Sequence, residues 1–279
     1  MTLDFNQRVI EEFRANGGRV GGPFEDARLI LLTTTGARSG QPHTVPLGCL
    51  PDGERSLVIA SAAGAPRHPA WYHNLRTRPR VTVEDGAFRY PADAVVLESE
   101  ERDRLFARAV EADPGWAEYQ GKTSRVLPVV ALRPAPGPPR PTGDTLGAFL
   151  LGSHDGIRRE LALIRKEAAG SGRTLGGQLR MNCLTLCLGL GQHHQGEDVG
   201  LFHLVAERRP DLAPILERLR AEHERLAVLL EELRTVLADD TTDPARLLRE
   251  VTRLTTELEE HLAYEEQQLL PVLDELPMP

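Results

Sequence analysis

Histidines and glutamates at helical spacing occur in the second half of the chain, and they predict a metal-binding site. Six of the nine histidines lie beyond residue 145. Glu197 follows His193 by four residues and Glu265 follows His261 by four, so each pair shares one face of a helix, one turn apart. Two further amphipathic stretches carry one such histidine each: His154 and His223. Four predicted helices therefore each contribute an imidazole, and two of them add a carboxylate.

The chemistry of this set favours iron. Imidazole nitrogens with carboxylate oxygens make a mixed site that suits iron better than calcium or magnesium, and two ions can share such a set through bridging carboxylates. The alternative is that single histidines on helices are hydrogen-bonded core residues or solvated surface groups. Two matched His-x-x-x-Glu pairs within a set spread over four helices favour the metal site.

Neighbouring residues indicate which of two adjacent histidines points inward. Apolar pairs follow His193 and His261 at the same spacing of eight and nine residues: Leu201 with Phe202, and Leu269 with Leu270. This shared register favours His193 over His194 as the inward residue. We therefore expect His194 at the surface, and we expect the same of His203; the alternative is that one of them fills a gap in the ligand set.

The elements that must position these side chains are four amphipathic stretches near residues 145–169, 176–206, 211–237 and 244–271. Asp211 and Asp243, each shortly ahead of a proline, are signals for the start of a helix. A Gly-Ser-Gly run at 170–172 separates the first helix from the second. Four helices of this length joined by short loops predict a four-helix bundle.

Over residues 145–275 these features resemble the hemerythrin family, in its HHE-type branch. The resemblance implies a non-haem di-iron centre that meets dioxygen or related small oxidants, with these ligands: His154, His193, Glu197, His223, His261 and Glu265. One position departs from the pattern. Oxygen-carrying hemerythrins place a second histidine four residues along the third helix, where this chain has Ala227. Fewer protein ligands would leave more open coordination positions, which favours reaction or sensing over reversible oxygen carriage.

The first half alternates short β-branched runs with turn signals, and it predicts a small, mostly antiparallel β-barrel. The six expected strands are residues 28–35, 41–50, 56–61, 80–85, 89–97 and 126–132. Asp-Gly pairs at 52–53 and 85–86 suit tight hairpins, since glycine accepts a positive φ. Helices are expected at 5–15, 71–77 and 99–111, the last with Ser99 as its cap.

A proline-rich stretch separates the two halves. Residues 133–143 contain five prolines, a composition that favours an extended spacer over a helix or a central strand. The sequence therefore predicts a β-barrel domain at 1–134, a linker at 135–143 and a helical domain at 144–279.

Separated segments of the barrel half carry groups typical of a cofactor-binding surface. Arg38 and Ser39 stand at a glycine-flanked turn, where backbone donors and a guanidinium can bind an anion. Ser61 and Gly64 follow a strand end. Aromatic and amide side chains come later: Trp71, Tyr72, Asn74, Trp116 and Tyr119. The alternatives are an exposed hairpin tip at Arg38 and simple core packing of the aromatic rings.

The order of these segments resembles the deazaflavin-dependent nitroreductase family over about residues 5–134. The motifs that carry the resemblance are TTTGxRSGQP, a Ser-x-x-Gly strand end, AWYxNL, WAEYQ and a final VLPVVAL strand. The resemblance implies a split β-barrel of the FMN-binding type that binds coenzyme F420. It implies these roles: Arg38 and Ser39 hold the phosphate and acidic tail, Ser61, Trp71 and Asn74 border the cofactor, and Trp116 with Tyr119 shapes the substrate side.

A deazaflavin delivers hydride from its own ring, so the protein must bind it, orient it and supply a proton. Tyr119 is the candidate proton donor, and its alternative role is a lid that excludes water. Members of the family usually carry basic residues where Ala37 and Ala62 stand, and an arginine where the cofactor-binding residue His43 stands. If each missing basic side chain contributes ~1 kcal/mol, the three changes together weaken the binding of the cofactor's anionic tail roughly a hundredfold.

Composition excludes some classes of partner. The net charge of −8 comes from the second half, because residues up to 140 carry 18 basic and 17 acidic side chains and the rest carry 15 and 24. Neither half has the basic stripe that nucleic-acid binding requires. No apolar run is long enough to span a membrane, and the acidic start MTLDFNQRVIEEF does not suit a signal peptide, so we expect a cytoplasmic protein. Three irregularly spaced cysteines are expected to be small buried thiols.

Together these features predict an oxidoreductase that joins an F420-binding reductase domain to a non-haem di-iron domain. The reductase would transfer hydride to a quinone or nitro compound, or pass electrons to the irons, and the irons would react with or sense dioxygen, peroxide or nitric oxide. The alternatives are a non-catalytic di-iron sensing protein with a degenerate barrel, and a di-iron oxygenase of a biosynthetic pathway.

Overall fold

The structure is a computed structural model that describes residues 2–136, 140–141, 145–172, 175–239 and 241–275. The chain divides into two compact units. One comprises residues 1–142 and 176–181, and the other comprises residues 143–175 and 182–279.

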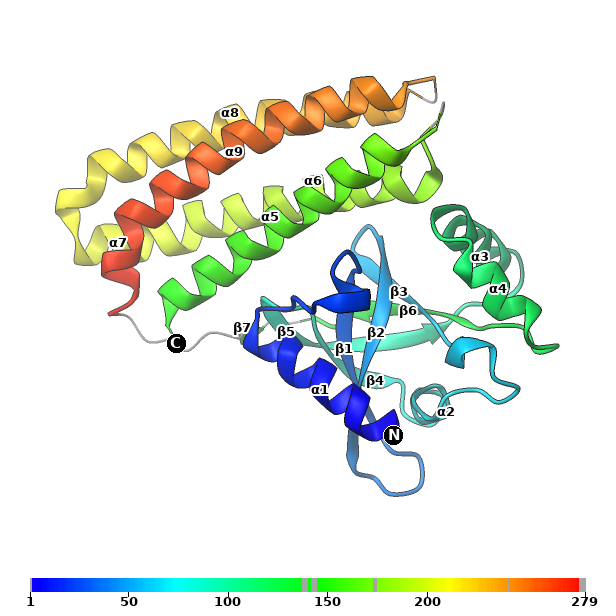
Figure 1. The fold of residues 1–279 in the computed structure, drawn as a ribbon. Coiled ribbons are helices and arrows are strands. Elements are labelled where there is room, and N and C mark those ends of the chain that lie inside the picture. Colours follow the sequence, from blue (N-terminus) through cyan, green and yellow to red (C-terminus); the bar gives the residue numbers. More distant parts are fainter. Residues whose placement is uncertain (1, 137–139, 142–144, 173–174, 240, 276–279) are drawn as a thin grey trace. The chain divides into compact units, whose positions relative to one another are not determined.

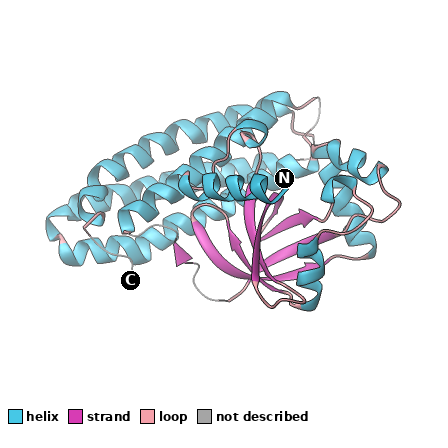
Figure 2. Cartoon of the chain, turned by 60° about the horizontal axis from the view of Figure 1, so that its bottom comes forward, coloured by secondary structure: helices cyan, strands magenta, loops and turns pink. Residues whose placement is uncertain are grey.

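Six antiparallel strands of the first unit close into a barrel. They are β1 (Leu29–Thr35), β2 (Pro42–Asp52), β3 (Arg55–Ile59), β4 (Arg80–Glu84), β5 (Phe88–Val96) and β6 (Val129–Pro134). The strand order is β4-β1-β2-β3-β6-β5, and β5 pairs back onto β4. Figure 2 shows the strands curving around this closed sheet. The predicted barrel and its six strands are confirmed.

A two-residue strand, β7 (Arg140–Pro141), pairs with Phe88 and Arg89 of β5. It lies in the predicted linker, whose composition argued against a central strand, and it is an edge strand. Proline is tolerated there because an edge strand can leave the missing N–H on its unpaired side. Residues 137–139 and 142–144 of the predicted linker lie outside the described residues.

Apolar residues alternate along the strands and fill two cores. In β3, Val58 points into the barrel with Trp71 and Leu75 of α2 (Ala70–Thr77). Its neighbour Leu57 points the other way, against Leu105 of α3 (Ser99–Ala112). A third cluster forms where α1 (Thr2–Ala15) packs on β1. The period of two in a strand thus places α1 and α3 on the outside of the barrel and the ring of Trp71 from α2 inside.

Two helix details differ from the sequence expectation. The residue before α3, Glu98, occupies the cap position, and Ser99 itself has a left-handed φ of 50°, so Ser99 does not cap the helix. A short helix, α4 (Gly115–Gly121), forms over the WAEYQ run, where no helix was predicted.

The second half folds into helices α5 (Leu146–Gly170), α6 (Gly177–Gly196), α7 (Phe202–Arg208), α8 (Ala213–Ala238) and α9 (Pro244–Leu273). The four long helices α5, α6, α8 and α9 run side by side (Figure 1), as predicted for a bundle. Asp243 caps α9 by accepting a hydrogen bond from the Arg246 N–H at 2.8 Å. Asp211 does not cap α8, because its carboxylate accepts hydrogen bonds from Arg209 instead.

A π-helical turn (Glu197–Leu201) follows α6 directly. It adds one residue to the helix, so the inward positions after it shift by one. Leu269, eight residues after His261, is fully buried, whereas the fully buried residue after His193 is Phe202, nine residues on. The shared register predicted for the two segments is therefore offset by one residue beyond the π-turn.

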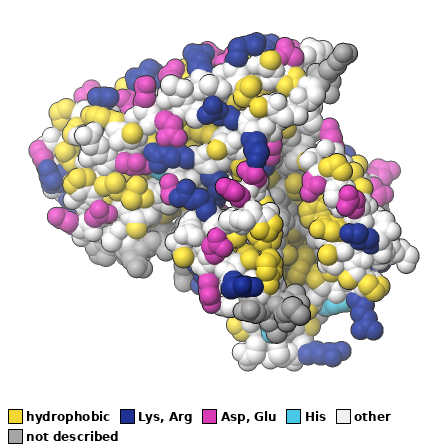
Figure 3. All heavy atoms as spheres, viewed as in Figure 1, with side chains coloured by type: hydrophobic (Ala, Val, Ile, Leu, Met, Phe, Trp, Pro, Cys, Tyr) yellow, Lys and Arg dark blue, Asp and Glu magenta, His cyan; other side chains and the backbone are white. Residues whose placement is uncertain are grey.

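The outer faces of the bundle helices carry mixed charge. Figure 3 shows basic and acidic side chains interspersed over the helices on that face. Arg253, for example, lies within 4 Å of Glu232, Glu250 and Glu257. The pairs with Glu250 and Glu257 have i,i+3 and i,i+4 spacing, which is typical of a solvated helix surface. None of the helices among the described residues is both long enough and apolar enough to cross a membrane.

Candidate functional site

The bundle brings together the six residues predicted to bind metal. They come from α5 (His154), α6 (His193), the π-turn (Glu197), α8 (His223) and α9 (His261 and Glu265). The Nε2 atoms of His223 and His261 lie 3.1 Å apart. Nε2 of His154 lies 3.5 Å from Oε2 of Glu265, and Nε2 of His193 lies 3.0 Å from Oε1 of Glu197.

Many polar atoms of this cluster, in which we include the adjacent His194, have no hydrogen-bond partner. Among the described residues, seven fully buried side-chain nitrogen and oxygen atoms of the cluster are unsatisfied: Nε2 of His154, His193 and His194, and both carboxylate oxygens of Glu197 and Glu265. A buried carboxylate or imidazole without a partner costs several kcal/mol. Bound cations remove this cost, because they neutralise the oxygens and use the nitrogen lone pairs. The residues present thus fit a metal centre.

Three further carboxylates orient the histidines. Nδ1 of His154 lies 2.8 Å from Glu266, and Nδ1 of His223 lies 3.0 Å from Asp198. Nδ1 of His261 lies 3.0 Å from Glu222. In each pair the carboxylate holds the outer ring nitrogen and leaves Nε2 directed at the cluster, as metal-binding histidines generally require.

Burial sets the protonation of the cluster. It lowers the pKa of His154 and His193, and it lowers that of His261 to about 4, so the imidazoles are neutral near pH 7 with a lone pair available. Burial also raises the pKa of Glu265 to about 8. Metal binding would therefore displace a proton from this site.

The outer carboxylates stay ionised. Burial alone would raise the pKa of Glu266, but hydrogen bonds from His154 and Arg158 outweigh it and lower the pKa to about 2. The pKa of Glu222 is also lowered, because hydrogen bonds from His261 and Arg218 outweigh its burial. An ionised carboxylate only accepts hydrogen bonds, so Nδ1 of His154 and of His261 carries the proton.

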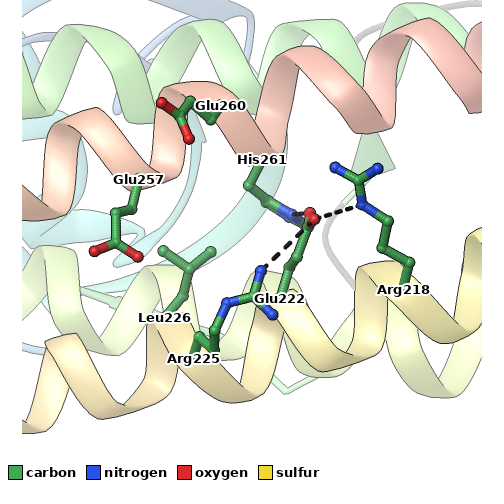
Figure 4. Close-up of a pocket in the computed structure, with 7 residues that line it drawn as sticks. All are labelled: Arg218, Glu222, Arg225, Leu226, Glu257, Glu260 and His261. Carbon is green, nitrogen blue, oxygen red and sulfur yellow. Dashed lines mark hydrogen bonds and ion pairs between the residues drawn. The ribbon is translucent and has the colours of Figure 1, made fainter.

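A surface pocket of about 180 Å³ lies outside His261, between α8 and α9. Figure 4 shows Glu222 between His261 and the guanidinium groups of Arg218 and Arg225. Arg218 donates to Glu222 at 2.8 Å. The pocket thus borders Glu222, the outer partner of a candidate ligand, although Glu222 itself is buried.

The surface prediction fails for His194. This side chain is buried at 5% exposure, and its ring stacks on His223 with 4.1 Å between ring centroids. Adjacent residues lie 100° apart on a helix, so His193 and His194 both reach the wide inner face of α6. His203 is exposed as predicted and lies 3.4 Å from Glu207. Ala227 is also exposed and faces away from the cluster.

Sequence reasoning missed the three outer carboxylates, although each stands beside a predicted ligand in the chain. Asp198 follows Glu197, Glu222 precedes His223, and Glu266 follows Glu265. Each of the three orients a histidine on a different helix. Adjacency to a ligand was the available signal, but the partner across the bundle is visible only in the fold.

In the barrel, the turn after β1 presents the predicted anion-binding groups. Arg38, Ser39 and His43 are exposed there, with Ser39 Oγ 3.3 Å from His43 Nε2. Asn74 is buried beneath the turn. Its amide donates to Thr34 Oγ1 and its carbonyl oxygen accepts from the Ala37 N–H, both at 3.0 Å. Asn74 therefore stabilises the turn through these two hydrogen bonds.

The loop after β3 has an unusual backbone. Ala62, Ala63 and Gly64 all have positive φ, of 46°, 52° and 81°. The step from right-handed Ser61 to left-handed Ala62 is typical of an anion-binding nest of backbone N–H groups. Arg125, which the sequence did not single out, holds this loop by donating to the carbonyl oxygens of Ala60, Ser61 and Ala65 at 2.5–3.0 Å. Such strain persists only where the surroundings enforce it.

The helix α4 packs on this loop and carries the predicted substrate-side residues. A Cβ at Gly64 would lie 2.9 Å from the Tyr119 carbonyl oxygen, so glycine is required there. The rings of Trp116 and Tyr119 meet edge to face at 6.0 Å, and the Lys122 ammonium lies over Tyr119. Trp71 lies in the barrel core at 6% exposure.

Comparisons with known proteins match each half of the chain to the kind of family that its sequence resembles. The family described as F420H(2)-dependent quinone reductase matches residues 6–134, and the family described as hemerythrin HHE cation binding domain matches residues 145–273. An F420H(2)-dependent quinone reductase of Mycobacterium tuberculosis (strain ATCC 25618 / H37Rv) is 38% identical over 124 residues, which are 43% of this chain and 83% of that protein. The same figures hold for its counterpart in strain CDC 1551 / Oshkosh.

A solved structure described as an F420-H2 dependent reductase (FDR-A) is 43% identical and aligns with a TM-score of 0.36, covering 38% of this chain and 94% of that one. The two family matches and the mycobacterial relatives confirm both resemblances, and with them an oxidoreductase. The chain belongs to the F420H(2)-dependent quinone reductase family through its barrel, and its second half matches the family described as hemerythrin HHE cation binding domain.

Proposed function

We propose that the protein is a two-part oxidoreductase. Its barrel binds F420 and reduces a small organic acceptor such as a quinone or a nitro compound. Its bundle holds two iron ions that react with or sense dioxygen, peroxide or nitric oxide. The observation that carries the iron part is the set of seven buried, unsatisfied donor atoms in the bundle. Family membership carries the barrel part.

The bundle would hold the irons through His154, His193, Glu197, His223, His261 and Glu265. Bound iron ions would supply one-electron redox chemistry toward a small oxidant. The protein keeps the imidazoles neutral by burial and fixes their Nε2 atoms with Asp198, Glu222 and Glu266. Glu197 lies within 4 Å of His154 and His223, and Glu265 lies within 4 Å of His154 and His261, so each carboxylate would hold iron together with histidines of two helices.

The barrel would hold F420 at the turn after β1 and the loop after β3. Bound F420H2 would supply a hydride from its ring. Arg38, Ser39 and His43 would bind the anionic groups of the cofactor, while Asn74 keeps their turn in place. Ser61 would contribute a backbone donor of the nest, and Trp71 would support the wall from the core.

Helix α4 would close the substrate side. Trp116 and Tyr119 lie next to the loop that starts at Ser61, so they can exclude water from the reacting ring. Tyr119 would also supply the proton that a reduced quinone needs. A Tyr119→Phe variant separates these roles, since it keeps the ring that excludes water and loses only the proton donor.

Direct measurements test the two halves. Aerobically purified full-length protein should contain iron by elemental analysis and absorb in the near-ultraviolet, and F420H2 with menadione should be consumed in its presence. Colourless protein without transition metal would overturn the iron part. Failure to oxidise F420H2 would overturn the barrel part.

Joining the two redox parts in one chain suggests that F420H2 passes electrons to the irons. Stopped-flow mixing of F420H2 with the ferric protein under argon tests this, because bleaching of the iron absorption must accompany loss of F420H2. If turnover with menadione persists in His261→Ala and the ferric centre is never reduced, the two parts work separately.

A second candidate is a non-catalytic metal or oxygen sensor whose barrel no longer binds cofactor. Ala37 and Ala62 favour it, because they stand where the family usually has basic residues. Equilibrium dialysis against F420 distinguishes the candidates, since micromolar binding excludes a degenerate barrel.

A further inference from the structure

We propose that His194 is a ligand of the bundle's metal centre, in addition to the six residues named from the sequence. The inference rests on the proposed iron site and extends it to a seventh residue. It starts from the position of His194 in α6, directly after His193 and inside the bundle.

The surroundings of His194 consist of other candidate ligands. Its ring stacks on His223 with an interplanar angle of 11°, and its centroid lies 5.5 Å from that of His261. Each of the three residues offers one nitrogen atom, and these atoms all lie within 4.8 Å of one another. Metal–nitrogen bonds of about 2.0–2.2 Å join donors that lie up to about 4.4 Å apart, so a small movement brings all three onto one ion.

The unsatisfied nitrogen distinguishes a ligand from a packing residue. Nε2 of His194 is fully buried and has no hydrogen-bond partner among the described residues. Stacking on His223 fills space but satisfies no nitrogen lone pair. A phenyl ring would stack equally well without the cost of a buried polar atom, so packing alone does not account for histidine at this position.

The histidines then divide into two groups. His154 and His193 lie with Glu197, and His194 lies with His223 and His261. Glu197 also lies 3.6 Å from His223, so its carboxylate joins the groups. Neighbouring residues of α6 thereby face two different ions, which the 100° rotation between them allows.

The test compares four forms of the full-length protein: wild type, His194→Ala, His194→Phe and His203→Ala. Iron per chain is measured by elemental analysis after reconstitution and desalting, together with the absorption spectrum of the ferric form. We expect His203→Ala to match wild type, because His203 is exposed and lies outside the cluster. We expect both His194 variants to retain about half of the wild-type iron, because one ion loses one of its three nitrogen donors.

Added imidazole separates ligation from packing. It should restore the iron content and spectrum of His194→Ala, which leaves a space for it, and should leave His194→Phe unchanged, because the phenyl ring fills that space. His194→Phe serves also as the second variant if His194→Ala fails to fold. The proposal is overturned if His194→Phe keeps the wild-type iron content and spectrum. Wild-type protein without iron would overturn the proposed iron site itself, and the His194 assignment with it.

Discussion

At the scale of single residues, the bundle site depends on pairs between an imidazole and an outer carboxylate. Glu222 on α8 serves His261 on α9, and Glu266 on α9 serves His154 on α5. Each pair joins two helices, so it contributes to helix packing as well as to ligand orientation. A partner that only orients the ligand should affect metal affinity more than it affects the fold.

Glu222→Gln should weaken iron binding by roughly ten- to hundredfold, the usual effect of removing such a partner. The amide keeps the shape of the side chain but loses the charge that holds Nδ1–H of His261. Competition with a chelator measures the change. Glu257→Gln is the matched control, because Glu257 lines the same pocket and its carboxylate lies 3.9 Å from Arg253 instead. Equal iron affinity in the two variants would contradict the orienting role.

The three cysteines lead to a prediction about thiol reactivity. Cys183 and Cys187 are fully buried in α6, and burial raises the pKa of Cys187 to about 11, whereas Cys49 in β2 is partly exposed. At pH 8 a disulfide reagent should therefore modify at most one thiol in the native protein and all three after unfolding. Rapid modification of two or more thiols in the native protein would show that α6 opens in solution.

At the scale of elements, the loop after β3 and helix α4 form one unit. The loop backbone is strained at Ala62 and Ala63, and Arg125 holds it through carbonyl oxygens. The close approach of α4 at Gly64 then fixes Tyr119 beside the loop. Cofactor binding at the loop and water exclusion by the helix should consequently be lost together.

Gly64→Ala should destabilise the protein by about 1–3 kcal/mol, because alanine is strained at a φ of 81°. The new methyl group would also meet Lys122 and the Tyr119 carbonyl oxygen, so α4 must shift. Urea unfolding and F420 affinity should both report the change. Gly121→Ala, at the end of the same helix in open space, should leave both nearly unchanged. A similar effect of both substitutions would mean that the close approach at Gly64 is not what holds α4.

The elements could largely be predicted because their signals are local. Short β-branched runs that alternate with turn signals predicted the six strands. Apolar residues at helical spacing predicted the bundle helices to within a few residues. The spacing of four gave the ligands on one helix, as for His193 and Glu197. The pairing of β7 and the partners of the outer carboxylates could not be predicted, because each depends on a contact with a distant part of the chain, and we found no local signal for the π-turn in the sequence. The burial of His194 was missed because a register borrowed from α9 does not hold across the π-turn.

At the scale of the whole molecule, the chain consists of two units that would bind different cofactors. Each unit has its own apolar core, one around the barrel strands and one around Phe202, Leu216 and Leu269 in the bundle. A ligand stabilises the unit that binds it by an amount that depends on its concentration relative to Kd. The two units should thus respond to different ligands.

Removal of iron from the full-length protein should lower the unfolding temperature of the bundle by several degrees and leave that of the barrel unchanged. An ion present at a hundredfold excess over its Kd contributes about 2.7 kcal/mol. Differential scanning calorimetry with and without a chelator, and with and without F420, should resolve two transitions with separate ligand dependence. A single transition that both ligands raise would show instead that the halves unfold as one.

The π-turn changes the angle around the helix axis between the candidate metal ligands of α6 and the core residues that follow them in the chain. In an uninterrupted helix, the packing of Phe202 would dictate the direction in which His193 faces, since each residue turns the next by 100°. The additional residue at Glu197–Leu201 changes this angle by a fixed amount, so His193 keeps its direction into the bundle while Phe202, and not Leu201, is fully buried. Deletion of one residue from the turn would therefore rotate either the imidazoles of α6 or the ring of Phe202 out of the bundle.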